Sequence, residues 1–155
     1  MQVSDFSMCR LIRRHLPLQQ GNVKLPLRRK RKFVDLHSVD PVGQVYPLVL
    51  EYAQRLWPEL GLIDDLSQDE GTPFWSGKSA TNVAYVRKNG IRYGCTSNRR
   101  TQADSYAFIV KDGVRVPAEI HTLLVLHVTD KLPNVCALVR RFVSDGNIPN
   151  FPWDL

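Results

Sequence analysis

The sequence is poor in cysteine, has no long hydrophobic run and contains no internal repeat or low-complexity tract. Only three of its 155 residues are cysteine, and Cys9, Cys95 and Cys136 lie far apart. An odd number of widely spaced cysteines argues against a disulfide framework and against a zinc site, so we expect a reducing compartment. No apolar run approaches the roughly 18 residues that a membrane-spanning helix needs, and residues 1–9 lack the apolar stretch of a secretory signal. We therefore predict no membrane association.

The sequence also lacks a complete phosphate-binding P-loop. Gly77-Lys78-Ser79 has the form of the end of one, but the motif needs glycine five residues before Gly77, where Thr72 stands. We predict a simple turn there.

Catalytic and metal-binding arrangements are missing as well. Cys95 and Cys136 fall on expected core faces, where a thiol behaves as a small apolar group. His121 and His127 are six residues apart on one expected strand, about 20 Å, so they cannot share a ligand. The acids of residues 64–70 follow no known metal-binding spacing. The sequence predicts a protein that is not an enzyme and has no cofactor.

Charge is distributed in three blocks. Residues 1–34 carry nine Lys and Arg against one acid, residues 35–75 carry eight acids against one Arg, and residues 76–155 carry eleven bases against six acids. Such asymmetry indicates segments with different roles. We predict a basic, mobile arm over residues 1–34, an acidic helical connector over 35–75 and a β-barrel domain over 76–155.

The arm contains five consecutive cations, which we call the basic run: Arg28, Arg29, Lys30, Arg31 and Lys32. Pro17, Gly21 and Pro26 break any regular element before it. A run of this kind contacts phosphate groups or serves as a nuclear import signal. The alternative is a solvated arm with no specific partner.

A helix is expected from residue 45 to about residue 60. Leu48, Tyr52 and Leu56 recur at helical spacing, with Val49 and Ala53 widening the apolar stripe. Proline at position 47 suits the first turn of a helix, and Pro58 closes it.

Residues 83–95 predict a β-hairpin with a type I′ turn at Asn89-Gly90, because Asn and Gly adopt positive φ at the least cost. Its strands pair Lys88 with Ile91 and Arg87 with Arg92. Side chains alternate along a strand, so one face is expected to meet the core and the other to be cationic. The expected core face carries Ala84, Val86, Ile91, Tyr93 and Cys95.

On the cationic face, Arg87 and Arg92 lie opposite each other with Tyr85 beside them. Like charges in such a position are destabilising, and an aromatic ring between guanidinium groups suits a nucleic-acid backbone or an acidic peptide. Alternatively, the arginines extend into water or pair with Glu119 or Asp104. Arg99 and Arg100, in the polar loop that follows, would extend a positive stripe.

Further strands complete a mainly β pattern. Asp112-Gly113 predicts a second type I′ hairpin, residues 118–128 a long and bent strand, and residues 135–143 the last strand. Short strands joined by hairpins without intervening helices indicate a small antiparallel barrel or sandwich.

The segment from residue 80 to residue 155 resembles a known group of proteins. The residues that carry the resemblance are Asn89-Gly90-Ile91-Arg92-Tyr93-Gly94, Val116-Pro117-Ala118-Glu119-Ile120 and Ala137-Leu138-Val139-Arg140-Arg141-Phe142, with Ile148-Pro149 and Phe151-Pro152-Trp153 near the end. They resemble a small domain of basidiomycete fungal hypothetical proteins similar to open reading frames of Kyakuja–Dileera–Zisupton and Plavaka-type DNA transposons. The strand order more distantly resembles the bromo-adjacent homology (BAH) barrel, a chromatin-binding module. The resemblance implies a non-catalytic domain of a mobile-element protein, and no catalytic carboxylates carry over.

These observations together predict a small antiparallel SH3-like or BAH-like barrel, preceded by a helical connector and a basic arm. We expect it to act in the nucleus and to bind nucleic acid weakly and without sequence preference, or else a chromatin-associated or acidic protein. The alternatives are a protein-interaction barrel whose arm serves only nuclear import, and a decayed transposon fragment. The expected contact residues are Arg28, Arg29, Lys30, Arg31, Lys32, Tyr85, Arg87, Arg92, Arg99 and Arg100.

Overall fold

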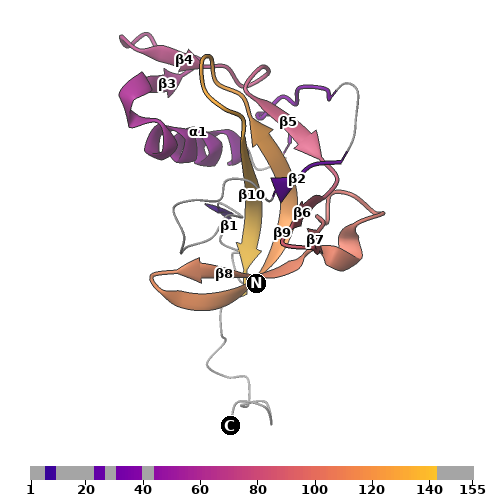
Figure 1. Ribbon diagram of the computed structural model, residues 1–155. Coiled ribbons are helices and arrows are strands. Elements are labelled where there is room, and N and C mark those ends of the chain that lie inside the picture. Colours follow the sequence, from indigo (N-terminus) through magenta and orange to yellow (C-terminus); the bar gives the residue numbers. More distant parts are fainter. Residues whose placement is uncertain (1–5, 10–22, 27–30, 40–43, 143–155) are drawn as a thin grey trace.

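The computed structural model describes residues 6–9, 23–26, 31–39 and 44–142. The fold is mainly β, with antiparallel sheets and one α-helix in the described ranges (Figure 1). None of the helices in these ranges is both long and apolar enough to cross a bilayer.

The main sheet is built around one long strand, β9, which spans Val114–Leu126. On one side β9 pairs with β10 (Asn134–Arg141), which in turn pairs with β1 (Phe6–Cys9). On its other side β9 pairs with β8 (Tyr106–Lys111) near its start and with β5 (Ala80–Val83) near its end. All of these pairings are antiparallel.

Two smaller sheets flank the main one. The first has the strand order β2 (Val23–Lys24), β6 (Val86–Lys88), β7 (Ile91–Tyr93). The second is a parallel pair, β3 (Leu62–Asp64) with β4 (Thr72–Phe74), which the sequence did not predict. Short 3-10 helices cover Pro58–Leu60 and Gln102–Asp104.

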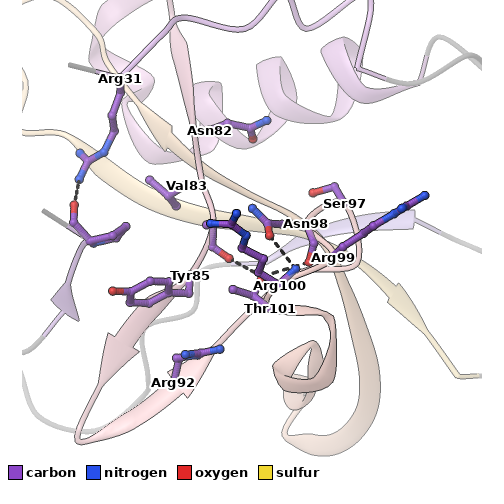
Figure 2. Close-up of a pocket in the computed structure, with 12 residues that line it drawn as sticks. Arg31, Asn82, Val83, Tyr85, Arg92, Ser97, Asn98, Arg99, Arg100 and Thr101 are labelled. Carbon is purple, nitrogen blue, oxygen red and sulfur yellow. Dashed lines mark hydrogen bonds between the residues drawn. The ribbon is translucent and has the colours of Figure 1, made fainter. Parts of the chain in front are cut away.

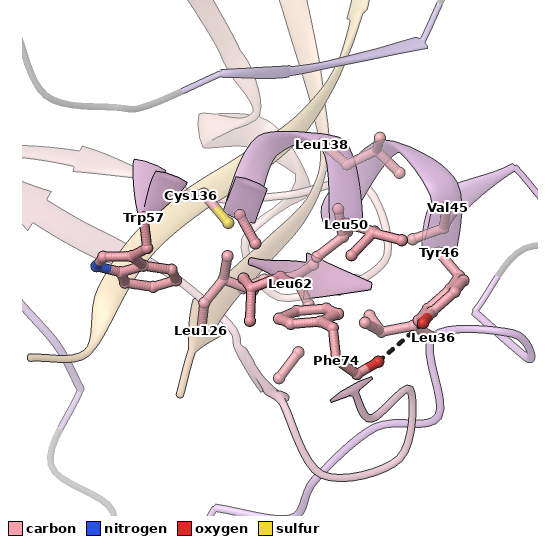
Figure 3. Close-up of a cluster of buried hydrophobic side chains, with 14 residues drawn as sticks. Leu36, Val45, Tyr46, Leu50, Trp57, Leu62, Phe74, Leu126, Cys136 and Leu138 are labelled. Atoms are coloured by element: carbon pink, nitrogen blue, oxygen red, sulfur yellow. Dashed lines mark hydrogen bonds between the residues drawn. The ribbon is translucent and has the colours of Figure 1, made fainter. Parts of the chain in front are cut away.

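The expected helix is present as α1, Val45–Leu56, with Pro47 in its first turn as predicted. Its most buried residues are Val45, Tyr46, Val49, Leu50 and Ala53, so the buried stripe lies one position away from the predicted one. These residues belong to one cluster with Leu126, Cys136 and Leu138 of the main sheet, and Figure 3 shows Val45, Tyr46 and Leu50 in this cluster. The helix therefore shares a core with strands of the predicted barrel domain.

The β9 strand, which the sequence predicted to be long and bent, has a β-bulge at His121. The register on β10 passes from Leu138 opposite Thr122 to Val139 opposite Ile120, which makes His121 the extra residue of this β-bulge. Because one extra residue reverses the alternation of side chains, Ile120 and Leu123 enter the same core cluster. The bulge lets both halves of β9 bury apolar side chains on that face.

Both predicted hairpin turns are confirmed. Asn89 and Gly90 have φ of 51° and 81°, and Asp112 and Gly113 have φ of 51° and 83°. The predicted pairs Arg87 with Arg92 and Lys88 with Ile91 are also present.

The sequence predicted a closed or nearly closed barrel, but no pairing among the described strands closes the main sheet. The expected continuous strand from Val83 to Lys88 is interrupted by a bend at Ala84. That bend assigns β5 to the main sheet and β6 to a separate sheet with β2 and β7. The predicted core face is consequently incomplete, since Val86 and Cys95 are buried but Ile91 is 57% exposed.

Parts of the expected arm are bonded to these sheets. β1 pairs with β10, β2 pairs with β6, and the amide of Val34 donates to the carbonyl of Ala80 at 3.0 Å. Phe33 forms a bridge with Thr81 of β5. Residues 6–9 thus lie along β10, residues 23–24 along β6, and residues 33–34 beside β5.

Candidate functional site

A loop from Gly94 to Ser105 fills the gap on the edge of β9 between β5 and β8. The amides of Thr96 and Ser97 donate to the carbonyls of Ile120 and His121 at 2.9 and 3.1 Å, and the amide of Ile120 donates to the carbonyl of Ser105 at 2.6 Å. These bonds replace a strand ladder across the gap, so the loop has a defined position on the sheet.

The buried side chain of Thr101 connects the same loop to the bend at Ala84. Its hydroxyl donates to the carbonyl of Ala84 at 2.8 Å, and its side chain is buried. Gly94 packs directly on Thr101, where any Cβ would lie 2.7 Å from the Thr101 Cβ and clash with its carbonyl oxygen. The loop is thereby attached to the bend between β5 and β6.

Between this loop, the bend and the end of the expected arm lies a cavity of about 730 Å³ (Figure 2). Five of the ten residues predicted from the sequence line it, and none of its lining residues is acidic. The lining consists of Pro26, Arg31, Asn82, Val83, Ala84, Tyr85, Arg92, Ser97, Asn98, Arg99, Arg100 and Thr101.

Four arginines from three separate parts of the chain meet at this cavity. Arg92 is held by Asp104, whose Oδ2 accepts from the Arg92 Nε at 2.6 Å, and its guanidinium lies 5.3 Å from the centre of the Tyr85 ring. Arg31 donates from one terminal nitrogen to the carbonyl of Pro26 at 3.1 Å, while its buried Nε has no acceptor among the described residues. Arg92 alone of the four therefore has a carboxylate partner in the described part of the chain.

Asn98 positions the two arginines of the loop. Its Oδ1 accepts a hydrogen bond from the backbone amide of Arg100 at 3.0 Å, so a local turn fixes the backbone at this point. In Figure 2 the side chain of Arg100 points from the loop toward the Val83 side of the cavity, whereas that of Arg99 points away from Tyr85. Both residues are exposed, and neither forms an ion pair with another of the described residues.

A second cationic feature lies on the neighbouring small sheet. Lys24 of β2 is in register with Arg87 of β6, which is in register with Arg92 of β7. All three are exposed, and we call them the cationic row. Residues in register on adjacent strands project to the same face about 5 Å apart, and like charges there are destabilising. The sequence offered Asp104 and Glu119 as partners for Arg87 and Arg92. Asp104 pairs with Arg92, whereas Glu119 lies 3.8 Å from Arg140.

The remaining predicted contact residues are not brought into the cavity. Arg87 and Lys32 are exposed outside its lining. Arg28, Arg29 and Lys30 lie outside the described residues.

The positive charge of Arg31 affects the pKa of His127, the residue directly after β9. Burial and the nearby Arg31 guanidinium both lower the pKa of His127, which stays in hydrogen-bonding contact with the Thr81 hydroxyl at 3.0 Å. The neutral imidazole is thus favoured beside a guanidinium.

Hydrogen bonds around the buried Tyr46 hydroxyl, away from the cavity, stabilise the fold. The Tyr46 hydroxyl donates to the carbonyl of Phe74 and accepts from the amide of Asp65, both at 2.8 Å. Burial alone raises the pKa of Asp65, but hydrogen bonds from Ser76 and the contact with His37 outweigh it and lower that pKa. These groups join α1 to the parallel pair β3–β4. Among the described residues no three His, Cys, Asp or Glu side chains are grouped to hold a metal ion.

Sequence reasoning missed Lys24, Asn82 and Asn98 as neighbours of the arginines. No local pattern marks the pairing of β2 with β6, because two-residue strands have no periodicity. Asn98 could have been found from the sequence. An Asn side chain in a polar loop often accepts a hydrogen bond from the backbone amide two residues on, and here that residue is Arg100.

Comparison of the chain with protein-family models, with curated proteins and with solved structures gives no match.

Proposed function

We propose that the protein binds nucleic acid weakly and without sequence preference, as a module that is not an enzyme. The observation that carries the proposal is the cavity lined by Arg31, Arg92, Arg99 and Arg100 with no acidic residue in its lining. Guanidinium groups bind phosphate oxygens in a bidentate manner, which makes arginine the preferred phosphate ligand. Phosphate contacts position a polyanion without reading its sequence.

The cationic row supports the same proposal. Aligning Lys24 and Arg87 beside Arg92 across three strands costs stability, and among the described residues the Asp104 carboxylate compensates only Arg92. A phosphate backbone on this face would relieve the repulsion. Arg31 belongs to the basic run and also lines the cavity, so we propose that the run and the cavity bind one polyanion.

A salt titration on a labelled duplex tests the proposal. If four or five phosphates are neutralised, log K falls with log salt at a slope of about −4. Changing Arg99 and Arg100 together to Ala should make the slope shallower by about 1.8, since each phosphate contact contributes about 0.9. Changing the five cations of the basic run to Ala should flatten it further.

The matched control changes Lys111 and Arg115 to Ala. These two exposed cations lie beside the β8–β9 turn, away from the cavity lining, and their loss changes the net charge by the same amount. The control should keep the wild-type slope. Equal slopes for the cavity variant and the control, or no binding at low salt of either the duplex or a single strand of the same length, would overturn the proposal.

The second candidate function is protein–protein interaction, and one observation favours it. Tyr106, Phe108 and Val110 alternate along β8 on one face and are 64%, 73% and 54% exposed. Adjacent exposed apolar side chains are typical of interaction surfaces. An acidic or chromatin-associated protein partner becomes the preferred proposal if the titration shows no nucleic-acid binding.

Three further proposals rest on the sequence alone. The basic run would direct the protein to the nucleus, where nucleic acid is found. The resemblance of residues 80–155 would make the chain a product of a fungal mobile element, either a working module or a decayed fragment. A distant relation to BAH or SH3-like barrels would account for the two hairpins, in an opened form of such a barrel.

A further inference from the structure

We infer that the cavity takes one unpaired nucleotide, so that the protein prefers single-stranded to duplex nucleic acid. The inference rests on the proposed function and adds the class of nucleic acid that the site selects.

The shape of the site is the first argument. The arginines surround a concavity of about 730 Å³ rather than a flat face, and this volume is in the range of pockets that enclose small molecules. A base in a duplex is stacked and paired, and extruding it costs a few kcal/mol. A base in a single strand can enter the cavity without that cost.

The chemistry of the walls is the second argument. Tyr85 is half-buried and lines the cavity, with the Arg92 guanidinium over its ring at 5.3 Å. Aromatic rings and guanidinium planes are the surfaces on which proteins stack unpaired bases. Duplex DNA offers such a ring no free base face, whereas an unpaired base does.

The remaining polar groups suit a base edge next to phosphates. Asn82 lines the cavity with an amide that has no partner among the described residues, and Asn98 uses its Oδ1 for the Arg100 amide, which leaves its NH₂ free to donate. In Figure 2 Tyr85 and Arg92 lie on one side of the cavity and Arg99 on the other. A nucleotide can therefore place its base beside Tyr85 and its phosphate toward the loop arginines.

The test compares a labelled thymidine 12-mer with a 12-base-pair duplex at one low salt concentration. Wild-type protein should bind the single strand about tenfold more tightly, within the range that one stacked base contributes. Tyr85→Leu, which removes the ring but keeps an apolar side chain, should lower the affinity for the single strand about tenfold more than the affinity for the duplex, so that the preference is lost. Tyr85→Phe should retain the preference, because it keeps the ring.

Other results would overturn the inference. Equal affinity of wild-type protein for both ligands, or an equal loss for both on Tyr85→Leu, would overturn the inference while nucleic-acid binding itself stands. No binding of either ligand would overturn the inference and the proposed function together. Far-UV circular dichroism of the Leu variant shows whether it is folded, and loss of the preference in Tyr85→Phe would contradict a stacking role even if the Leu variant failed to fold.

Discussion

At the scale of single residues, buried polar groups in this protein are used mainly to join segments distant in sequence. The Tyr46 hydroxyl connects α1 to Phe74 of β4 and to Asp65, which directly follows β3. Thr101 does the same for the site loop and the bend at Ala84. Each hydroxyl replaces a backbone partner that the irregular local structure does not supply.

The first prediction concerns Tyr46, whose pKa burial raises to about 12 from the ordinary 10. Between these pH values the unfolded state releases the phenolic proton while the folded state keeps it. The contribution of Tyr46 to the free energy of unfolding is therefore fully present below pH 10 and is lost as the pH rises through 12. The free energy of unfolding should fall in this window by at most about 1.4 kcal/mol per pH unit.

Urea titrations of wild-type protein and Tyr46→Phe at pH 7 and at several values from 9.5 to 12 provide the measurement. At pH 7 the Phe variant should be less stable by about 1–3 kcal/mol, because the Phe74 carbonyl and the Asp65 amide lose their partner. The difference between the two proteins should shrink above pH 10. A difference that stays constant from pH 7 to 12 would show that Tyr46 does not titrate as described.

At the scale of elements, the site depends on a loop that stands where a strand would otherwise lie. The loop from Gly94 to Ser105 uses three backbone hydrogen bonds to β9 in place of a ladder. An irregular segment can present four consecutive polar side chains, from Ser97 to Arg100, on the side away from the core, whereas a strand would turn every second one toward the sheet. The arginines can therefore gather at one cavity.

The second prediction tests this loop with Gly94→Ala. A methyl group at Gly94 meets the backbone and Cβ of Thr101, so Thr101 must move and its bond to Ala84 must stretch. Overpacking of this kind typically costs about 1–3 kcal/mol in the free energy of unfolding. Binding to the labelled oligonucleotide should also weaken, because Arg99 and Arg100 lose their position.

Gly77→Ala is the matched control, since a Cβ there meets nothing within 4 Å. Its stability, measured by urea unfolding, should stay within about 0.5 kcal/mol of wild type. If both glycine variants keep wild-type stability, the close packing of Gly94 on Thr101 is not a constraint on the fold.

At the scale of the whole molecule, two apolar clusters lie on the two faces of the main sheet. Leu124, Leu126, Cys136 and Leu138 pack with α1 on one face, and Leu123, Val125, Ala137 and Val139 pack with the β5–β6 region on the other. Because β9 and β10 contribute to both clusters, loss of either strand exposes both. We expect helix and sheet to unfold together.

The third prediction is that Leu138→Ala destabilises α1 and the sheet in one transition. Leu138 is 1% exposed within the cluster that covers the helix, and truncation of a buried leucine typically costs about 2–5 kcal/mol. Urea unfolding followed by circular dichroism at 222 nm and by hydrogen exchange of β10 amides should shift by the same amount. Separate midpoints would instead support the predicted division between residues 35–75 and 76–155 as independent folding units.

The sequence by itself determined the features that depend on a few neighbouring residues. Asn89-Gly90 and Asp112-Gly113 specify their turns through positive φ, the apolar spacing of residues 45–56 specifies a helix, and the turn at Asn89 sets Arg87 opposite Arg92. The mainly β class follows from these turns and the alternation around them. Five of the ten expected contact residues also proved to share one cavity.

Only the tertiary structure decided how these pieces combine. The bend at Ala84 divides one expected strand between two sheets, and the pairing of Lys24 with Arg87 completes the cationic row. Arg31 lines the same cavity as the loop arginines although 68 positions separate it from Arg99. Such pairings are chosen by the total apolar surface that the packed sheets bury, and no short stretch of sequence carries that information.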